Sequence, residues 1–269
     1  GKVRDSNSLS VLECLNCGLV FLSQSELPVG FYEQAKMHGQ NPPSVDEWLR
    51  ETFKDDERRF AFLSVAITNR DLLDFGCGAG GFLIKAKAKA RSAMGIELED
   101  RLQHHFKSNG IEVVKRIEEL PASRKFDLIT AFHVIEHLKD PVATLSELAI
   151  RCRADGKIIV EIPSSSDALL TVYENIPFSE FTYWSCHLYL FNATNLAILA
   201  KKAGLTLDYV KHIQRYPLSN HLFWLARGRP GGHHTWSFLD SGDLDKAYEA
   251  SLAAIGKTDT LIACFSNKR

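Results

Sequence analysis

Three glycines and two acidic residues at fixed spacing give the strongest chemical signal in the sequence. Asp74 lies near the end of a short apolar run, Glu97 ends the next one, and the loop after Asp74 contains Gly76, Gly78 and Gly80. Glycines let a chain turn tightly and let a ligand approach the backbone, and an acid at the end of the next strand can accept hydrogen bonds from both hydroxyls of a ribose. The pattern therefore predicts a ligand that contains a nucleoside.

The same loop also fits a dinucleotide pattern, because Gly76, Gly78 and Gly81 satisfy GxGxxG. Asp74 discriminates between the two kinds of ligand. A carboxylate repels a dianionic pyrophosphate but attracts an ammonium group, such as that of the methionine part of S-adenosylmethionine. The sequence therefore favours S-adenosylmethionine over NAD.

Short apolar runs alternate with amphipathic segments on both sides of this loop. Strands are expected at 71–75, 93–97, 112–115, 126–134, 157–162, 206–213 and 260–265, and helices at 46–66, 81–91, 100–108, 141–153 and 192–203. This alternation predicts an α/β fold with a doubly wound, mostly parallel, seven-stranded sheet and helices on both faces.

Four segments resemble the core of class I S-adenosylmethionine-dependent methyltransferases. They are DFGCGAG at 74–80, GIE at 95–97, FDLITAFHVIEHLKDP at 126–141 and GKIIVEIP at 156–163, in the order and spacing of that family. Together they lie within about a third of the chain. The resemblance implies a Rossmann-like methyltransferase sheet, S-adenosylmethionine as cofactor and S-adenosylhomocysteine as product.

The resemblance also implies positions around the cofactor. The glycine loop would line the methionine, Glu97 would hold the ribose, and the end of the fourth strand would lie beneath the sulfonium. The family often has an Asp that binds the adenine amine, but this sequence has Arg116 there, so the backbone at Ile117 and Glu118 are expected instead. The predicted cofactor-binding residues are Asp74, Gly76, Cys77, Gly78, Gly80, Glu97, Leu98, Ile117, Glu118, Phe132 and His133.

Residues 133–137 read His-Val-Ile-Glu-His, which also matches the HxxEH pattern of some zinc peptidases. That pattern requires a helix, whereas this segment begins at the end of a predicted strand. Some quinone O-methyltransferases that resemble this family carry Glu-x-x-Glu-His here and use it with a divalent metal, but this chain has His133 in place of the first Glu. We expect Glu136 and His137 to brace the loop before Pro141, so no metal site is assigned; a weak metal site at these two residues is the alternative.

Two segments, at about 164–191 and 217–257, interrupt the alternation. Methyl transfer requires the acceptor to be positioned, with a base where the acceptor loses a proton. The first segment is rich in aromatic residues, and His187 is predicted as the base, with Tyr183 sharing its proton relay. The alternative is a structural histidine that packs against the helix at Asn192. Further candidates are His221, His233 and His234, the last two in an expected turn.

Residues 14–22 read CLNCGLVFL and resemble half of a zinc knuckle. Some bacterial sugar C-methyltransferases and polysaccharide-cluster relatives carry a CxxC…CxxC ribbon whose second half reads CxxCGLVF. The resemblance implies that zinc is possible in a longer chain through Cys14 and Cys17. Because the first residue is Gly, we expect that the chain was cut before this segment. The aromatic side chain of Tyr32 is expected either to reach the cofactor carboxylate or to pack against neighbouring residues.

The composition narrows the class of protein. Of 269 residues, 32 are Lys or Arg and 33 Asp or Glu, so the formal net charge is −1. This balance gives no electrostatic footprint for nucleic acid or an anionic membrane. The six cysteines do not suggest a disulfide scaffold, so a cytoplasmic setting is expected. The expected partner is a small-molecule substrate, and the expected state is a monomer or homodimer.

These observations predict a knuckle and linker at 1–45 and one methyltransferase domain at 46–269. The expected reaction is methyl transfer from S-adenosylmethionine to a small or medium polar metabolite. A sugar or nucleotide-sugar acceptor is the first expectation, and it depends on the CxxCGLVF resemblance alone. O-methylation of a phenol or quinone-like ring is the alternative. A second alternative is a non-catalytic methyltransferase-like binding subunit, but the intact Asp74 and Glu97 argue against it.

Overall fold

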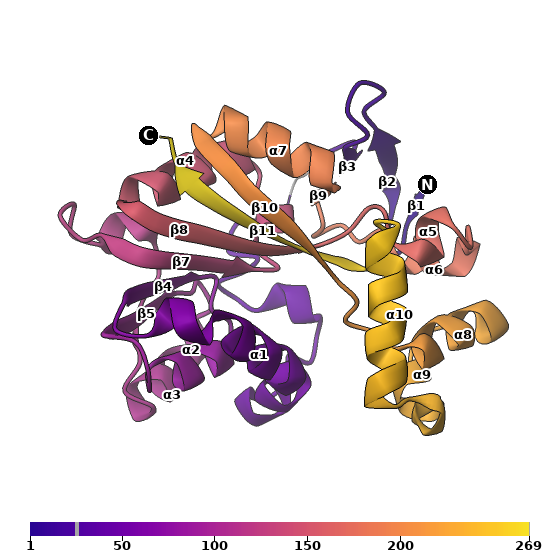
Figure 1. The fold of residues 1–269 in the computed structure, drawn as a ribbon, viewed down its shortest axis with the longest axis horizontal. Helices are drawn as coiled ribbons and strands as arrows, with labels where there is room; N and C mark the ends of the chain where they lie inside the picture. Colours follow the sequence, from indigo (N-terminus) through magenta and orange to yellow (C-terminus); the bar gives the residue numbers. More distant parts are fainter. Residues whose placement is uncertain (25–26, 269) are drawn as a thin grey trace.

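The computed structural model describes residues 1–24 and 27–268, and its centre is a seven-stranded sheet (Figure 1). The strand order is β10-β11-β8-β7-β4-β5-β6. The strands are β4 (Asp71–Phe75), β5 (Ser92–Ile96), β6 (Glu112–Val114), β7 (Phe126–Phe132), β8 (Cys152–Pro163), β10 (Leu205–Ile213) and β11 (Thr260–Asn267). Strands β6, β5, β4, β7 and β8 are parallel, whereas β11 runs antiparallel to β8 and β10. The predicted fold class is confirmed.

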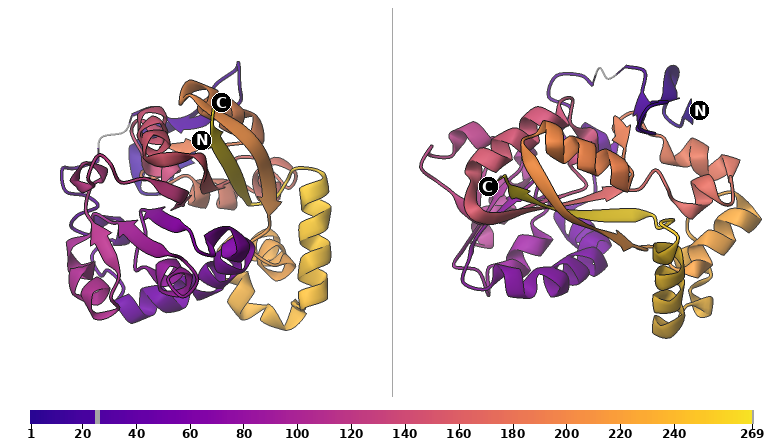
Figure 2. Two further views of the ribbon diagram at one scale, coloured as in Figure 1. Left: turned by 60° about the vertical axis from the view of Figure 1, so that its left-hand side comes forward. Right: turned by 45° about the horizontal axis from the view of Figure 1, so that its top comes forward.

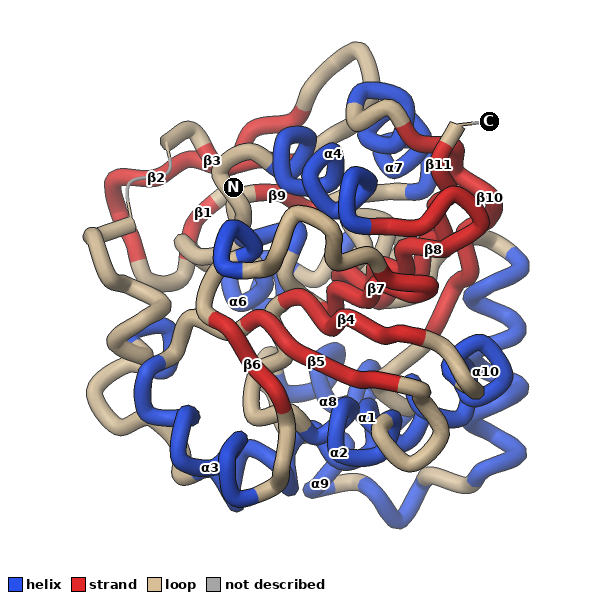
Figure 3. The backbone as a smooth tube through the Cα atoms, turned by 90° about the vertical axis from the view of Figure 1, so that its left-hand side faces the viewer, coloured by secondary structure: helices blue, strands red, loops and turns tan. Residues whose placement is uncertain are grey.

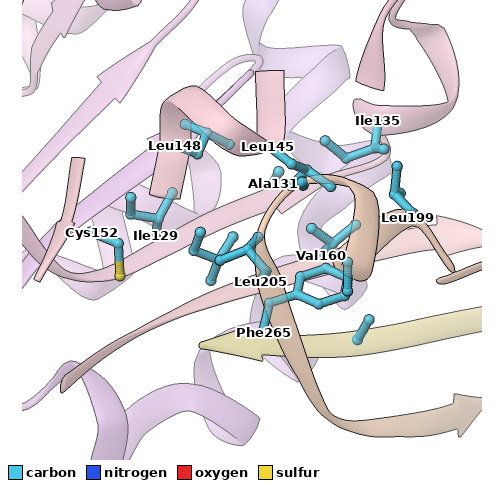
Figure 4. Close-up of a cluster of buried hydrophobic side chains, with 14 of the residues drawn as sticks. Ile129, Ala131, Ile135, Leu145, Leu148, Cys152, Val160, Leu199, Leu205 and Phe265 are labelled. Atoms are coloured by element: carbon cyan, nitrogen blue, oxygen red, sulfur yellow. The ribbon is translucent and has the colours of Figure 1, made fainter. Parts of the chain in front are cut away.

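Helices cover both faces of this sheet (Figures 1 and 3). On one face lie α1 (Val45–Ile67), α2 (Gly81–Ala86) and α3 (Gln103–Ser108), and on the other α4 (Pro141–Arg151) and α7 (Ala193–Lys202). Leu145 and Leu148 of α4 and Leu199 of α7 pack with Ile129 and Val160 of the sheet in a hydrophobic core (Figure 4). Burial of such side chains contributes about 1.5–3 kcal/mol each, so these layers fix the ends of the strands firmly.

Local sequence explains where several helices begin. Ser44 and Glu47 form a reciprocal capping box at α1, and Asn192 and Asn195 do the same at α7. Pro141 occupies the first turn of α4, where its missing N–H is not needed. The helix expected at 81–91 ends at Ala86 instead, and Arg91 pairs with Asp71 at the start of the sheet.

The N-terminal segment forms a second, four-stranded sheet with a strand from the first insertion (Figure 2). Its order is β1 (Lys2–Val3), β2 (Ser6–Glu13), β3 (Val20–Leu22) and β9 (Tyr189–Leu190). Strands β2 and β3 form an antiparallel hairpin, and the CxxC segment lies in the turn between them. The division of the chain at residue 45 stays a prediction.

Both insertions contain short helices. The first contains α5 (Ala168–Thr171) and α6 (Ile176–Thr182), and the second α8 (Leu218–Arg227), α9 (Gly232–Thr235) and α10 (Gly242–Ala254). The turn expected around His233 and His234 is the short helix α9. Short 3-10 turns lie at Lys36–His38, Asp100–Leu102, Ile117–Glu119, Ile135–His137 and Ser237–Leu239. Among the described residues, none of the helices has the length and apolar character needed to cross a membrane.

Candidate functional site

A cavity of about 490 Å³ opens at the carboxyl ends of β4, β5 and β7. This volume falls within the roughly 300–1,000 Å³ that is usual for small-molecule sites. In open α/β sheets, ligands bind outside the carboxyl ends of the strands, where the strand order reverses. Here β5 and β7 lie on opposite sides of β4, so the cavity lies at that reversal.

The glycine loop forms the floor of this cavity in a backbone conformation that side chains do not tolerate. Gly76, Gly78 and Gly80 have φ of 73°, 52° and 75°. A Cβ atom at Gly76 would lie 2.4 Å from Cγ2 of Val134, and one at Gly78 would lie 3.0 Å from the Trp48 ring. The glycines are therefore required both for the turn and for the close approach of neighbouring side chains.

Glu97 is held in place from the glycine loop. Its Oε2 accepts a hydrogen bond of 2.8 Å from the backbone N–H of Gly78, and its Oε1 accepts one of 2.9 Å from that of Glu99. Burial raises the pKa of Glu97 above its ordinary value, while these two hydrogen bonds lower it. Each carboxylate oxygen keeps a lone pair for a ligand, so the side chain is oriented to accept from a diol.

Asp74 lies beneath the loop, fully buried. Oγ1 of Thr130 donates a hydrogen bond of 2.7 Å to its Oδ1. Burial raises the pKa of Asp74 to about 7. The charge argument drawn from the sequence is therefore weakened, because a carboxyl with a pKa of about 7 is only partly ionised at neutral pH. Burial also raises the pKa of the Cys77 thiol, which stays protonated.

Most of the predicted cofactor-binding residues line this cavity, and three do not. Gly80 contributes to the site only by shaping the turn before α2, whereas Ile117 packs in the hydrophobic core. The lining includes the predicted Asp74, Gly76, Cys77, Gly78, Glu97, Leu98, Phe132 and His133, but not Gly80, Ile117 or Glu118. The assignment of adenine to the last two stays a prediction.

Helix α1 supplies a wall that sequence reasoning missed. Trp48, Thr52, Asp56 and Arg59 line the cavity. Oγ1 of Thr52 donates to Asp56 at 2.8 Å, and the Arg59 guanidinium lies 4.6 Å from the centroid of the Phe132 ring. The sequence feature that could have revealed this wall is the run of charged residues at 55–59 inside an otherwise amphipathic helix. Charged side chains that become buried need partners, so such a run indicates a buried polar site.

The partner of that run is Glu161 on β8. Arg59 donates to its Oε1 from Nη2 at 2.7 Å, and Arg58 donates to its Oε2 from Nη1 at 2.9 Å. Burial opposes the charge of Glu161, but Arg59, His133 and Arg58 together hold its pKa well below the ordinary value. This network ties α1 to the sheet beside the cavity.

His133 occupies a strained position at the end of β7. Its φ is 55°, a left-handed conformation that a residue other than glycine adopts only when its surroundings require it. Its Nδ1 lies 3.3 Å from Oε1 of Glu136, and its Nε2 lies 3.3 Å from Oε1 of Glu161. Residues 135–137 form a 3-10 turn, so the helix required by the zinc-peptidase pattern is absent from this described segment.

Glu136, His137 and His187 bring one ligand atom each to within 4.8 Å of one another. Glu136 is fully buried, and its Oε2 accepts no hydrogen bond from the described residues. Burial opposes its charge, but the neighbouring histidines hold the pKa of Glu136 below the ordinary value. Burial lowers the pKa of His137, and lowers that of His187 to about 3, so both imidazoles are neutral. A buried carboxylate with two neutral imidazoles suits a divalent cation.

The sequence singled out Glu136 and His137 but expected them to brace a loop, and it assigned His187 to a different role. The third ligand comes from the first insertion, some 50 residues later, where Leu188 N–H bonds to the Glu136 carbonyl at 2.8 Å. Tyr183, the expected relay partner of His187, instead packs against Val3 and Leu188. It lines neither of the two cavities described here.

The other candidate residues fall in three places. Tyr32 lines the cavity, with its ring centroid 6.1 Å from that of His137. His221 is buried and its Nδ1 lies 2.6 Å from the Tyr248 hydroxyl. Cys14 and Cys17 lie in a turn at the tip of the N-terminal hairpin, where the backbone N–H of Gly18 bonds to the Cys14 carbonyl at 2.7 Å.

A second cavity of about 220 Å³ adjoins the first and shares Trp184, His187 and Arg215 with it. We call these three shared residues the neck. His187 therefore lies between the two spaces. Arg215 also escaped sequence reasoning. It is paired through Nε with Oδ1 of Asp55 at 3.1 Å, on the missed wall of α1.

The fold and the site define a Rossmann-like α/β protein with a nucleoside-type binding cavity at the reversal of strand order. The chain belongs to the methyltransferase-domain family, whose pattern matches residues 45–210. Membership of this family implies S-adenosylmethionine as the cofactor.

Curated relatives match parts of the chain. A ubiquinone biosynthesis O-methyltransferase of Methylococcus capsulatus is 26% identical over 149 residues, covering 51% of this chain and 62% of its own length. A tRNA U34 carboxymethyltransferase of Aeromonas hydrophila is 29% identical over 105 residues, covering 35% of this chain and 32% of its own. The chain thus spans less than two thirds of these relatives.

Solved structures share the fold. Magnesium protoporphyrin IX methyltransferase of Synechocystis PCC 6803, with bound S-adenosylhomocysteine, has a TM-score of 0.53 at 14% identity, and covers 89% of this chain and 94% of its own. One chain of a Haloferax volcanii complex between the Trm112 methyltransferase activator and a methyltransferase gives a TM-score of 0.55 at 13% identity, covering 84% of this chain and 98% of its own. At such identities the likeness supports the fold alone.

Proposed function

We propose that this chain transfers a methyl group from S-adenosylmethionine to a small-molecule acceptor. The observation that carries the proposal is the hydrogen bond between Glu97 and the glycine loop, because the Gly78 N–H orients a half-buried carboxylate at the place where a ribose would lie. Family membership supports the same cofactor. The formal net charge of −1 supports a small acceptor over a nucleic acid.

The two adjoining cavities suggest how the reactants meet. The cofactor would occupy the larger cavity and the acceptor the smaller one, so that the methyl group passes through the neck. Displacement at the methyl carbon forms the bond from the acceptor atom and breaks the bond to sulfur, and its rate depends mainly on alignment. His187 is the proposed base. It is neutral, and the charge of the buried Glu136 nearby reduces the cost of its gaining a proton, although burial still holds its pKa at about 3.

The first acceptor class is a polar metabolite such as a sugar or nucleotide-sugar. Its support is the resemblance of residues 14–22 to the second half of a zinc ribbon. Under this proposal, Cys14 and Cys17 would bind zinc only with a second ligand pair, since a structural zinc requires four ligands. The turn between β2 and β3, with both thiols free, is compatible with such a half-site.

A second acceptor class is a phenol or quinone-like ring, and one specific observation favours it. Glu136, His137 and His187 offer a set of ligands beside the neck that a divalent cation would fit. A bound cation would act as a Lewis acid that lowers the pKa of a ring hydroxyl. Within this chain, Glu136 would supply the negative charge, and the two histidines would fix the position of the oxygen.

Binding of S-adenosylmethionine, measured by calorimetry, tests the proposed function. We expect binding to the wild type, a loss of about tenfold or more in Glu97→Gln, and no change in the matched control Glu112→Gln, which is exposed on β6. Absence of binding to folded wild-type protein would overturn the proposal. Binding without release of S-adenosylhomocysteine for any acceptor would point to a non-catalytic binding subunit.

A further inference from the structure

The second cavity has the position and the walls of a site for the acceptor. It adjoins the proposed cofactor cavity through the neck, Trp184, His187 and Arg215. An acceptor atom at the neck would therefore face the methyl group, while the rest of the molecule filled the second cavity. The inference below rests on the proposed function and concerns the class of acceptor.

Aromatic rings form much of the wall of this cavity. Phe178, Phe181 and Trp224 line it from α6 and α8. The ring centroids of Phe178 and Trp224 are 5.1 Å apart at an interplanar angle of 79°, and those of Phe181 and Trp224 are 5.2 Å apart. Such surfaces bind flat rings by stacking and edge-to-face contacts.

Several polar groups of the same wall already have partners within the protein. Asp259 accepts from the backbone N–H groups of Arg215 and Tyr216, each at 3.0 Å. Oδ1 of Asn220 lies 3.1 Å from Nδ1 of His233. A sugar ring would need free partners for its hydroxyls, because buried polar groups that lose water without replacement are costly. The wall therefore favours an aromatic ring over a sugar ring.

Arg4 brings an uncompensated positive charge to the outer rim. Its guanidinium carbon lies 4.6 Å from the centroid of the Trp184 ring and 4.8 Å from that of Phe181. Among the described residues, no acid forms an ion pair with it, and Asp5 is bound to the N–H and hydroxyl of Ser185. Its Nη1 donates one long hydrogen bond of 3.5 Å to the Phe181 carbonyl. A stacked guanidinium that keeps further N–H groups for a ligand is a good receptor for a carboxylate or phosphate.

The acids of the wall do not cancel this charge. Burial raises the pKa of Asp167 to about 8, with the neighbouring Asp259 adding to the shift, so Asp167 is mostly neutral at neutral pH. Asp259 is half-buried and accepts hydrogen bonds from the backbone N–H groups of Arg215 and Tyr216, whereas Arg4 is exposed. The rim of the cavity is thus positive and its walls are aromatic.

We propose that the second cavity binds an acceptor built on an aromatic ring with an anionic substituent. The ring lies against Phe178, Phe181 and Trp224, and the anion pairs with Arg4. The reacting atom then lies at the neck beside His187.

Calorimetry with the full chain, saturated with S-adenosylhomocysteine, tests this assignment. The probes are 4-hydroxybenzoate, its neutral counterpart 4-hydroxybenzamide, phenyl phosphate and glucose 1-phosphate. We expect 4-hydroxybenzoate or phenyl phosphate to bind about tenfold or more tightly than 4-hydroxybenzamide and glucose 1-phosphate. Whichever of these two aromatic anions binds more tightly identifies the preferred anionic group as carboxylate or phosphate. Added NaCl should weaken that binding.

Variants at Arg4 separate charge from packing. Arg4→Gln should remove the preference for the anion, and Arg4→Lys should keep most of it. Arg229→Gln is the matched control, because the Arg229 guanidinium also lies over a ring, that of Phe223, but outside both cavities. Binding of S-adenosylhomocysteine should stay unchanged in all three variants.

Three results would overturn the assignment: equal binding of the amide, equal binding of glucose 1-phosphate, or no binding of either aromatic anion at millimolar concentration. Each would leave the proposed function standing if S-adenosylhomocysteine still binds. Failure of S-adenosylhomocysteine itself to bind would instead refute the proposed function.

Discussion

Thr130 on β7 donates a hydrogen bond of 2.7 Å to Asp74 on β4, and both side chains are shut off from solvent. The bond joins neighbouring parallel strands directly beneath the glycine loop. It stabilises the charged form of Asp74, but burial outweighs it and raises the pKa to about 7. Any cationic ligand above this carboxyl must therefore compete with a proton.

The affinity for S-adenosylmethionine should rise with pH between about 6 and 8. The cationic ligand favours the ionised carboxyl, so below a pKa of about 7 a proton must leave on binding, which costs up to tenfold in affinity per pH unit. Calorimetry across this range measures the slope. Asp74→Asn should bind weakly and show no slope, and a flat profile in the wild type would contradict the role of Asp74.

A divalent cation such as Mn²⁺ should bind at Glu136, His137 and His187. The buried carboxylate and two neutral imidazoles provide the donors, and protonation of the imidazoles in acid should release the ion. Titration calorimetry measures the affinity, which should fall at least tenfold in Glu136→Gln and in His187→Ala. The control Glu112→Gln should bind as the wild type does. Unchanged affinity in both site variants would show that the cluster holds no metal.

Gly76→Ala should cost far more stability than Gly204→Ala, at the residue after the C-cap of α7. Both glycines have positive φ, 73° and 77°, so an alanine costs about 1–2 kcal/mol at either position. At Gly76 the new Cβ also meets Val134 at 2.4 Å, which adds about 1–3 kcal/mol, whereas nothing lies within 4 Å at Gly204. Urea unfolding measures both. The double change Gly76→Ala with Val134→Ala should recover part of the loss, and equal costs at the two glycines would refute the clash.

Glu161→Gln should lower the free energy of unfolding by about 3–5 kcal/mol, because buried Arg59 loses its closest carboxylate and keeps only the longer pair with Asp56 at 3.4 Å. Glu57→Gln, which breaks the exposed pair with Lys85, should cost less than about 1 kcal/mol. The folded-state pKa of Glu161 is depressed, so its contribution is present above the ordinary value and is lost as pH falls. Denaturant unfolding at neutral and acidic pH checks both statements. Similar losses for the two variants would contradict the structural role of Glu161.

The sequence revealed the parts of the site that depend on short spacing. The glycine loop and Glu97 lie within about 25 residues, and each follows a strand that its own apolar run predicts. The order of the parallel strands then places them together without further information. Gly80 illustrates the limit, because its role is to turn the chain and not to line the cavity.

The rest depends on contacts between segments far apart in the chain. Arg215 reaches the cavity by pairing with Asp55, 160 residues earlier, and His187 joins Glu136 through an insertion whose path no local pattern predicts. Tyr183 was selected for its type and its nearness to His187 in sequence, but its neighbours in the hairpin placed it elsewhere. The periodicity of apolar residues predicts helices and strands, but it does not predict how an insertion crosses the sheet.

The pairing of β9 with β3 has a consequence for how the site assembles. Leu188, just before β9, accepts a hydrogen bond from the N–H of Leu22 at 3.1 Å and donates its own N–H to the Glu136 carbonyl, so the segment that carries His187 is held from both sides. Closing a contact across more than 160 residues is slow, because much chain entropy is lost before the contact forms. We therefore expect the backbone amides of the large sheet to become protected from hydrogen exchange early in refolding. His187 should reach its place late, so that the neck is the last part of the protein to form.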